Sequence, residues 1–183
     1  VVNGQTYTED VVNGSIVKVI SGLPAGTYTA KVTYSGDMRY SSITKSPKFI
    51  VAKLDPYMNV TANNIIYGQN AVFNVALPSD ATGTVSVTVG TKSGSATVSN
   101  GEATISISGL TRGDYQYNVT YSGNGKYSSD TKTSTISVDK TTATFSVLPI
   151  ADINVDDYAN FAISGLPSDA NGIITVVVGD LSN

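Results

Sequence analysis

The sequence predicts an all-β fold of tandem antiparallel β-sandwiches, and three observations support this prediction. Apolar and polar residues alternate along short segments, as they do in strands that bury one face. Asn-Gly pairs and other turn residues separate these segments. The same series of segments also occurs more than once along the chain. Helical periodicity is not seen in any part of the sequence.

Two pairs of segments define the repeat. GLPAGTYTAKVTYSGDMRYSS, which begins at Gly22, recurs 87 positions later as GLTRGDYQYNVTYSGNGKYSS, from Gly109. LPSDATGTVSVTVG, which begins at Leu77, recurs 89 positions later as LPSDANGIITVVVG, from Leu166. These pairs predict one complete repeat at 55–140, the second half of a repeat at 1–54, and the first half of another at 141–183.

The complete repeat contains about seven predicted strands, of which the first lies around Met58 and Val60. Short strands at this spacing, without crossover helices, predict a two-sheet sandwich of the immunoglobulin class. The alternating positions of the later strands are Ala71, Phe73, Val75 and Leu77; Val85, Val87 and Val89; Ala103, Ile105 and Ile107; Tyr115, Tyr117, Val119 and Tyr121; and Ser134, Ile136 and Val138.

One turn occurs in both copies of the second half. Gly26 and Tyr28, and their counterparts Gly113 and Tyr115, resemble the turn into strand F of such sandwiches, where a tyrosine corner is fixed through its hydroxyl. This turn, with LPSDATGTVSVTV, SNGEATISISGL and the closing YSS, resembles the bacterial and archaeal Ig-like repeats of large adhesin-like surface proteins, especially those of methanogens. The resemblance implies an extracellular, cell-surface location and a structural or adhesive role, and it supplies no catalytic residue.

The composition argues against several functions. The sequence has no Cys and no His, so it lacks thiol nucleophiles, imidazole bases and the common soft metal ligands. With 14% charged residues and a net charge of -3, it has no basic surface for nucleic acids. No apolar run is long enough for a membrane helix. We therefore expect a protein that is not an enzyme, has no cofactor, and neither binds nucleic acid nor inserts into a membrane.

One segment partly matches a calcium loop. Asp152, Asn154 and Asp156 supply oxygen ligands at alternate positions, as the first half of such a loop does. Asp157 then stands where the loop needs Gly, and Ile163 where it needs Glu. A polar strand and turn is therefore the favoured interpretation, and no metal is predicted.

Two equivalent loops, SGDMRY and SGNGKY, place a cation beside a tyrosine. Arg39 with Tyr40, and Lys126 with Tyr127, could stack on a sugar or hold a protein partner. Their near identity between repeats favours a structural turn between the last two strands. Binding of a glycan or protein through these loops is the alternative function.

Three sequons are candidates for N-glycosylation, at Asn13, Asn59 and Asn118. Asn118 is expected to face solvent, because Tyr117 and Val119 occupy the inward positions on either side of it. In a chain rich in Asn, Ser and Thr, such triplets also arise from composition alone.

The half repeats pose a physical problem, because half a sandwich exposes an apolar face and an open sheet edge. A repeat of this size is about 30 Å across, whereas a four-residue junction spans about 14 Å, so we do not expect the halves to meet within one chain. Neighbouring repeats in a longer protein, or another copy of the chain, would then complete them. The second case gives a head-to-tail filament or a swapped dimer. The predicted function is a stalk module of a large surface protein.

Overall fold

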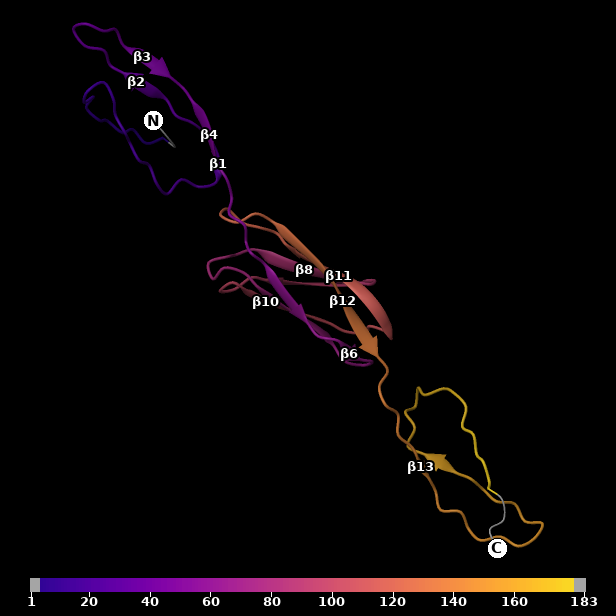
Figure 1. The fold of residues 1–183 in the computed structure, drawn as a ribbon. Coiled ribbons are helices and arrows are strands. Elements are labelled where there is room, and N and C mark those ends of the chain that lie inside the picture. Colours follow the sequence, from indigo (N-terminus) through magenta and orange to yellow (C-terminus); the bar gives the residue numbers. More distant parts are fainter. Residues whose placement is uncertain (1–3, 180–183) are drawn as a thin grey trace. The chain divides into compact units, whose positions relative to one another are not determined.

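The computed structural model describes residues 4–179, and all regular structure among them is β-strand (Figure 1). The prediction of an all-β fold with antiparallel sheets is confirmed. The chain divides into two compact units, one up to Asp139 and one from Lys140. Residues 1–3 and 180–183, the outer ends of the two predicted half repeats, lie outside the described residues.

The segment that begins after Leu54 forms a two-layered sandwich. All neighbouring strands are antiparallel except β6 and β12, which are parallel. The three-stranded layer has the order β10–β7–β5, with β5 at Asn59–Ala62, β7 at Ala71–Ala76 and β10 at Glu102–Ile107. The five-stranded layer has the order β6–β12–β11–β8–β9, with β6 at Ile65–Ile66, β8 at Thr84–Val89, β9 at Lys92–Thr97, β11 at Gly113–Tyr121 and β12 at Asp130–Asp139.

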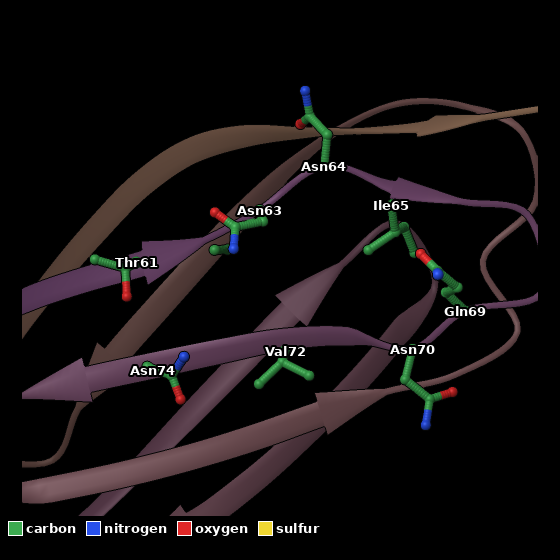
Figure 2. Close-up of a pocket in the computed structure, with 9 residues that line it drawn as sticks. Thr61, Asn63, Asn64, Ile65, Gln69, Asn70, Val72 and Asn74 are labelled. Atoms are coloured by element: carbon green, nitrogen blue, oxygen red, sulfur yellow. The ribbon is translucent and has the colours of Figure 1, made fainter.

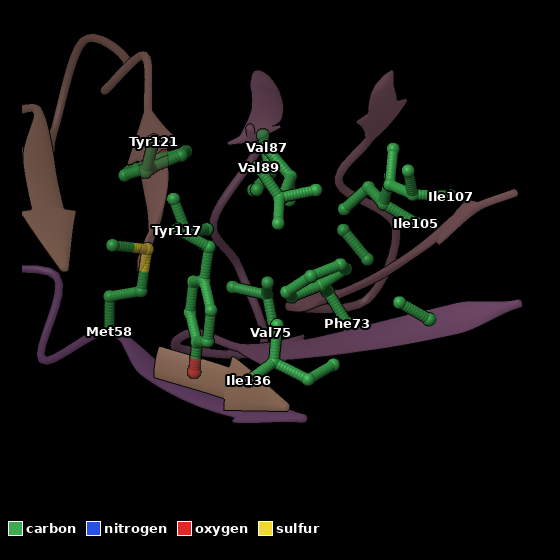
Figure 3. Packing of buried hydrophobic residues seen from close by; sticks show 14 of the residues in the cluster. Met58, Phe73, Val75, Val87, Val89, Ile105, Ile107, Tyr117, Tyr121 and Ile136 are labelled. Carbon is green, nitrogen blue, oxygen red and sulfur yellow. The ribbon is translucent and has the colours of Figure 1, made fainter. Parts of the chain in front are cut away.

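The core lies between these two layers and consists of the inward residues of the alternating strands (Figure 3). Phe73 and Tyr117 meet edge to face with ring centroids 4.9 Å apart, so the two layers contact each other directly at the centre of the sandwich. Leu77 and Tyr115 are half-buried at its margin, and Ser134 is exposed. The other predicted alternating positions are buried, and Met58, Ala81, Val98, Leu110 and Tyr127 join them.

The sequence pattern did not predict β9, because this strand has no large apolar residue. It lies at the edge of the five-stranded layer and pairs only with β8. A Cβ atom at Gly94 would lie 2.9 Å from side-chain carbons of both Ile105 and Ile107, so the position admits no larger residue without displacing them. The small inward residues of β9 therefore reflect the close approach of β10 across the sandwich.

Residues 4–54 contain shorter versions of the strands that form the second half of this sandwich. The strand pairs are β1 (Gly26–Thr29) with β4 (Lys48–Val51), and β2 (Val32–Tyr34) with β3 (Ile43–Lys45). Their registers are those of β11 and β12: Tyr28 lies opposite Phe49 as Tyr115 lies opposite Ile136, and Val32 opposite Lys45 as Val119 lies opposite Lys132.

The Asn-Gly turn at Asn13 also has the same conformation as its counterpart at Asn100. Asn13 and Gly14 have φ angles of 50° and 75°, and Asn100 and Gly101 have 51° and 77°. These positive values are typical of tight hairpin turns and agree with the turn chemistry predicted from the sequence.

The segment from Lys140 contains one pair of short antiparallel strands, β13 (Ser146–Val147) and β14 (Ile163–Ser164). Residues 173–179 resemble β8 in sequence but form no strand. In the complete sandwich β8 pairs with both β11 and β9, whereas residues 141–179 contain no strand that corresponds to either of them. Without a neighbouring strand, an alternating sequence cannot satisfy its backbone hydrogen bonds in a sheet.

Candidate functional site

The loop between β11 and β12 is a compact turn organised by Asn124. Its side-chain oxygen accepts hydrogen bonds from the backbone N–H groups of Lys126 and Tyr127, each at 2.8 Å. Gly123 precedes it with φ = 72°, and a Cβ atom there would lie 2.7 Å from the backbone nitrogen of Ser129. The motif SGNGKY therefore encodes a defined loop shape.

This loop turns inward onto the loop between β7 and β8. Tyr127 is only 5% exposed, and its hydroxyl donates to Oδ1 of Asp80 at 2.7 Å. The Lys126 ammonium donates to the other carboxylate oxygen of Asp80. Tyr121 donates its hydroxyl to the backbone oxygen of Thr82 at 2.6 Å. We call the set Asp80, Thr82, Tyr121, Asn124, Lys126 and Tyr127 the Asp80 cluster.

Charge and hydrogen bonding shift the ionisation of this cluster. The hydrogen bonds from Lys126 and then Tyr127 lower the pKa of Asp80 below its ordinary value. The same contacts, that with Asp80 first, raise the pKa of Lys126. Burial raises the pKa of Tyr121. The ion pair is accordingly formed across the neutral pH range, and all three groups keep the protonation states that their hydrogen bonds require.

The Asp80 cluster also anchors the segment that precedes the sandwich. The Leu54 N–H donates to the Lys126 carbonyl at 2.9 Å, and the Ser128 N–H donates to the Leu54 carbonyl at 2.9 Å. Pro56 follows and is fully buried. The loop that the sequence singled out as a binding candidate therefore holds the junction between repeats.

Tyr127 corrects one part of the sequence prediction. A ring that is buried and hydrogen-bonded from its hydroxyl cannot stack on a sugar in solvent, so Tyr127 does not serve as a surface platform. Lys126 is exposed but paired with Asp80. In the copy, Arg39 is exposed and Tyr40 is 67% exposed, so only this loop presents both side chains outward.

The copy of the loop has the same internal hydrogen bonds. Asp37 takes the place of Asn124, and its Oδ1 accepts from the N–H groups of Arg39 and Tyr40 at 2.7 and 2.8 Å. Tyr34, the counterpart of Tyr121, donates to Oδ2 of Asp37 at 2.7 Å. This hydrogen bond, followed by those from Arg39 and Tyr40, lowers the pKa of Asp37, and it raises the pKa of Tyr34. The loop is preformed although Arg39 and Tyr40 are exposed.

A shallow groove of about 280 Å³ lies on the three-stranded layer near the break between β5 and β6 (Figure 2). Its polar lining consists of Thr61 and several amide side chains, and most of these amides already make hydrogen bonds within the fold. Asn64 accepts from the Ser137 N–H at 2.9 Å, Gln69 from the Ile66 N–H at 3.2 Å, and Asn74 from the Thr104 hydroxyl at 3.1 Å. The groove has no charged lining residue and offers no group for acid–base chemistry.

The sequon asparagines lie on three different elements. Asn13 is exposed at the tip of a turn, Asn59 is exposed at the start of edge strand β5, and Asn118 is exposed on β11. The Asn118 side-chain oxygen accepts from the Thr133 hydroxyl at 2.7 Å. Glycosylation of these residues stays a prediction.

The calcium-like segment is a tight exposed turn. Oδ2 of Asp157 accepts from the backbone N–H and the side-chain amide of Asn154 at 3.0 and 3.2 Å, and Asp156 has φ = 73°. Asp157, at the position where a calcium loop has Gly, thus closes the turn onto Asn154, and Asp152 lies outside this turn. In residues 4–179 no group of three or more acidic side chains gathers in a way that could hold a metal ion.

Comparison with known proteins gives a match, and it lies in the middle sandwich. Residues 58–139 match the bacterial Ig-like domain family (group 3), whose members are non-catalytic modules usually found in surface proteins. The match agrees with the immunoglobulin-class sandwich predicted from the strand pattern. A search of curated proteins found no match to the chain. Within the described part of the chain there is no helix of the length and hydrophobicity needed to span a bilayer.

Proposed function

We propose that the bacterial Ig-like domain at 58–139 is a tension-bearing spacer in the stalk of a large cell-surface protein. The parallel pairing of β6 with β12 carries this proposal. Val138 lies opposite Ile65 and Asp139 opposite Ile66, and the Tyr67 N–H donates to the Asp139 carbonyl at 2.8 Å. Strand β6, which follows the first strand β5, is thus bonded alongside β12, the strand that leaves the domain.

Parallel pairing of these strands determines how the domain responds to pulling. Force applied through the preceding and following segments slides β6 and β12 past each other, so their hydrogen bonds are loaded together and not one after another. The Asn64 side chain adds a bond to the Ser137 N–H at the same place. Such an arrangement suits a module that keeps its length under load.

The other end of the domain supports the same function. The N–H and the carbonyl of Leu54 are both hydrogen-bonded to the loop at 126–128, and the buried Pro56 restricts the backbone of the chain that follows. A junction held in this way extends little under force, so the force reaches the first strand directly. The loop is occupied by this task, which makes ligand binding through Lys126 and Tyr127 the weaker alternative.

Single-molecule force spectroscopy tests the proposal. The 183-residue chain, pulled from its two ends, should show one dominant unfolding event for the middle domain. Asn64→Ala should lower the unfolding force, since it removes a bond across the sheared pair. Asn63→Ala is the matched control, because the Asn63 side chain makes no hydrogen bond in the described residues. Equal forces for both variants and the unmodified chain would contradict a clamp at β6 and β12.

Attachment assays test the alternative. Replacing Arg39, Tyr40 and Lys126 together by Ala should leave adhesion to cells and to immobilised glycans unchanged if the module is a spacer. A loss of adhesion with an intact middle domain would instead assign binding to these loops.

A further inference from the structure

Apolar side chains outside the middle sandwich are left uncovered. Every buried apolar residue in the described part of the chain lies between Pro56 and Val138. In the N-terminal segment Val32, Tyr40 and Phe49 are exposed, although their counterparts Val119, Tyr127 and Ile136 are buried. In the C-terminal segment Ile174 and Val178, the counterparts of the buried β8 residues Val85 and Val89, are exposed as well. Both segments gain free energy from any partner that covers these faces.

The loops that would meet across such an interface are already shaped for it. The loop at 36–40 has the hydrogen bonds of the loop at 123–127, with the N–H of Asp37 donating to the Tyr40 carbonyl as that of Asn124 donates to the Tyr127 carbonyl. In the C-terminal segment the Ala170 N–H donates to the Pro167 carbonyl at 3.0 Å. The middle domain has the same bond from Ala81 to Pro78 at 2.8 Å.

The middle domain shows how these two loops fit together, because the Asp80 cluster joins the same two parts of a repeat. Asp169 is the counterpart of Asp80, and Arg39 and Tyr40 are the counterparts of Lys126 and Tyr127. The carboxylate, the cation and the phenol are all retained. Arg39 can also bind the Asp169 carboxylate through two N–H groups, which Lys126 cannot do for Asp80.

One hydrogen bond of the cluster would have its direction reversed between the two end segments. In the middle domain the Asn124 side-chain amide donates to the Thr82 hydroxyl at 3.1 Å. The corresponding residues of the two end segments are Asp37 and Asn171. Asp37 has only acceptors, and Asn171 has an amide donor in place of the hydroxyl. The two segments are therefore complementary to each other at each side-chain contact of the cluster.

We propose that residues 4–54 of one copy of this chain close against residues 141–179 of a second copy to form a composite Ig-like sandwich. Arg39 and Tyr40 of the first copy bind Asp169 of the second, and the face carrying Val32 and Phe49 covers the face carrying Ile174 and Val176. The contact is heterologous, so it produces a closed dimer or a head-to-tail chain. It holds whether or not the protein is displayed on a cell surface.

Charge reversal tests this assembly in solution. The 183-residue chain should show a weight-average mass that rises with concentration in sedimentation experiments between about 1 μM and about 1 mM. Asp169→Arg and Arg39→Asp should each weaken association by about tenfold or more, because each places like charges in contact. Asp152→Arg, an equal charge change on an exposed residue of the same segment, should have little effect. Thermal unfolding of the middle domain should be the same in all three variants.

Mixing the two impaired variants gives the decisive result. Arg39 on the Asp169→Arg chain can pair with Asp169 on the Arg39→Asp chain, and the two reversed residues can pair with each other. Association should therefore return in the mixture and only there. A chain that stays monomeric at every concentration would overturn the proposal, as would association that survives both single variants or a mixture that is not rescued.

Discussion

The hairpin of β11 and β12 and its copy in residues 26–51 have the same local structure but different degrees of burial. Both have the same register, and both have a tyrosine corner: the Tyr115 hydroxyl donates to the Thr111 carbonyl at 3.0 Å and the Tyr28 hydroxyl to the Pro24 carbonyl at 2.8 Å. Val119 is nevertheless 0% exposed, whereas its counterpart Val32 is 52% exposed. The local sequence thus determines the register and turn of the hairpin, whereas its inward side chains are buried only where the opposite layer covers them.

The hydrogen bonds of the two hairpins show the same difference between contacts within the hairpin and contacts with the opposite layer. Tyr121 donates across the sandwich to the Thr82 carbonyl, whereas its counterpart Tyr34 donates to Asp37 in its own loop. Paired threonines join the strands in both hairpins, Thr120 with Thr131 and Thr33 with Thr44. Contacts within a hairpin therefore survive without the rest of the sandwich, and contacts between its layers do not.

The largest expected effect comes from removing an inward side chain at matched positions. Ile136→Ala should lower the free energy of unfolding of the middle domain by about 2–5 kcal/mol, because Ile136 is 1% exposed and its loss leaves a cavity. Phe49→Ala, at the equivalent position of the copy, should lower the free energy of unfolding far less, since Phe49 is already 38% exposed. Urea unfolding followed by far-ultraviolet circular dichroism measures both.

These measurements belong at the lowest usable protein concentration, where association between copies makes the smallest contribution. Equal decreases in the free energy of unfolding for the two variants would show that the copy is packed as tightly as the complete domain.

A second test concerns the loop glycines. Gly123→Ala should destabilise the middle domain by about 1–2 kcal/mol or more, because φ is 72° and the new Cβ would meet the backbone near Ser129. Gly125→Ala is the control, since a Cβ atom there would have no neighbour within 4 Å. Gly36→Ala creates the same strain in the copy, with φ = 83°, and should leave the midpoint of the middle domain unchanged. If Gly125→Ala destabilised the middle domain as much as Gly123→Ala, this explanation would be contradicted.

The fold was largely predictable from sequence because burial in a sandwich alternates along each strand. Phe73, Val87 and Ile105 were identified as inward residues in this way, and all three are buried. The two elements that escaped prediction have no such signal. Strand β9 has small inward residues where β10 approaches, and β6 has only two residues and is set by its neighbour β12.

The Asp80 cluster was only partly predictable. The motif SGNGKY marked the loop, and its repetition favoured a structural role. The partner Asp80 lies 46 positions from Lys126, in a loop that the sequence showed only as a turn. Pairing between distant loops depends on the sandwich topology, so the burial of Tyr127 could not be read from its neighbours in sequence.

The tyrosine corners provide a smaller test of the same comparison. Tyr115→Phe removes the hydroxyl that bonds to Thr111 and should lower the free energy of unfolding of the middle domain by about 0.5–1.5 kcal/mol. Tyr28→Phe removes the equivalent bond to Pro24 in the copy and should not move the urea midpoint of the middle domain. An equal shift for both would mean that the two segments unfold together.

The smallest effect is a dependence on pH. The pKa of Asp80 is lowered in the folded state, mainly by the Lys126 hydrogen bond, so the folded protein holds its proton less tightly than the unfolded chain does. Its stabilising contribution is therefore present above about pH 4, the range of an ordinary Asp, and is lost as the pH falls through the lowered folded value. Asp80→Asn should reduce the thermal midpoint at neutral pH and flatten its decline in acid. Asp37→Asn removes a carboxylate whose pKa is also lowered, but within the copy alone, and should leave that decline unchanged. If both variants flatten the curve equally, the acid sensitivity does not come from the contact between the two loops of the middle domain.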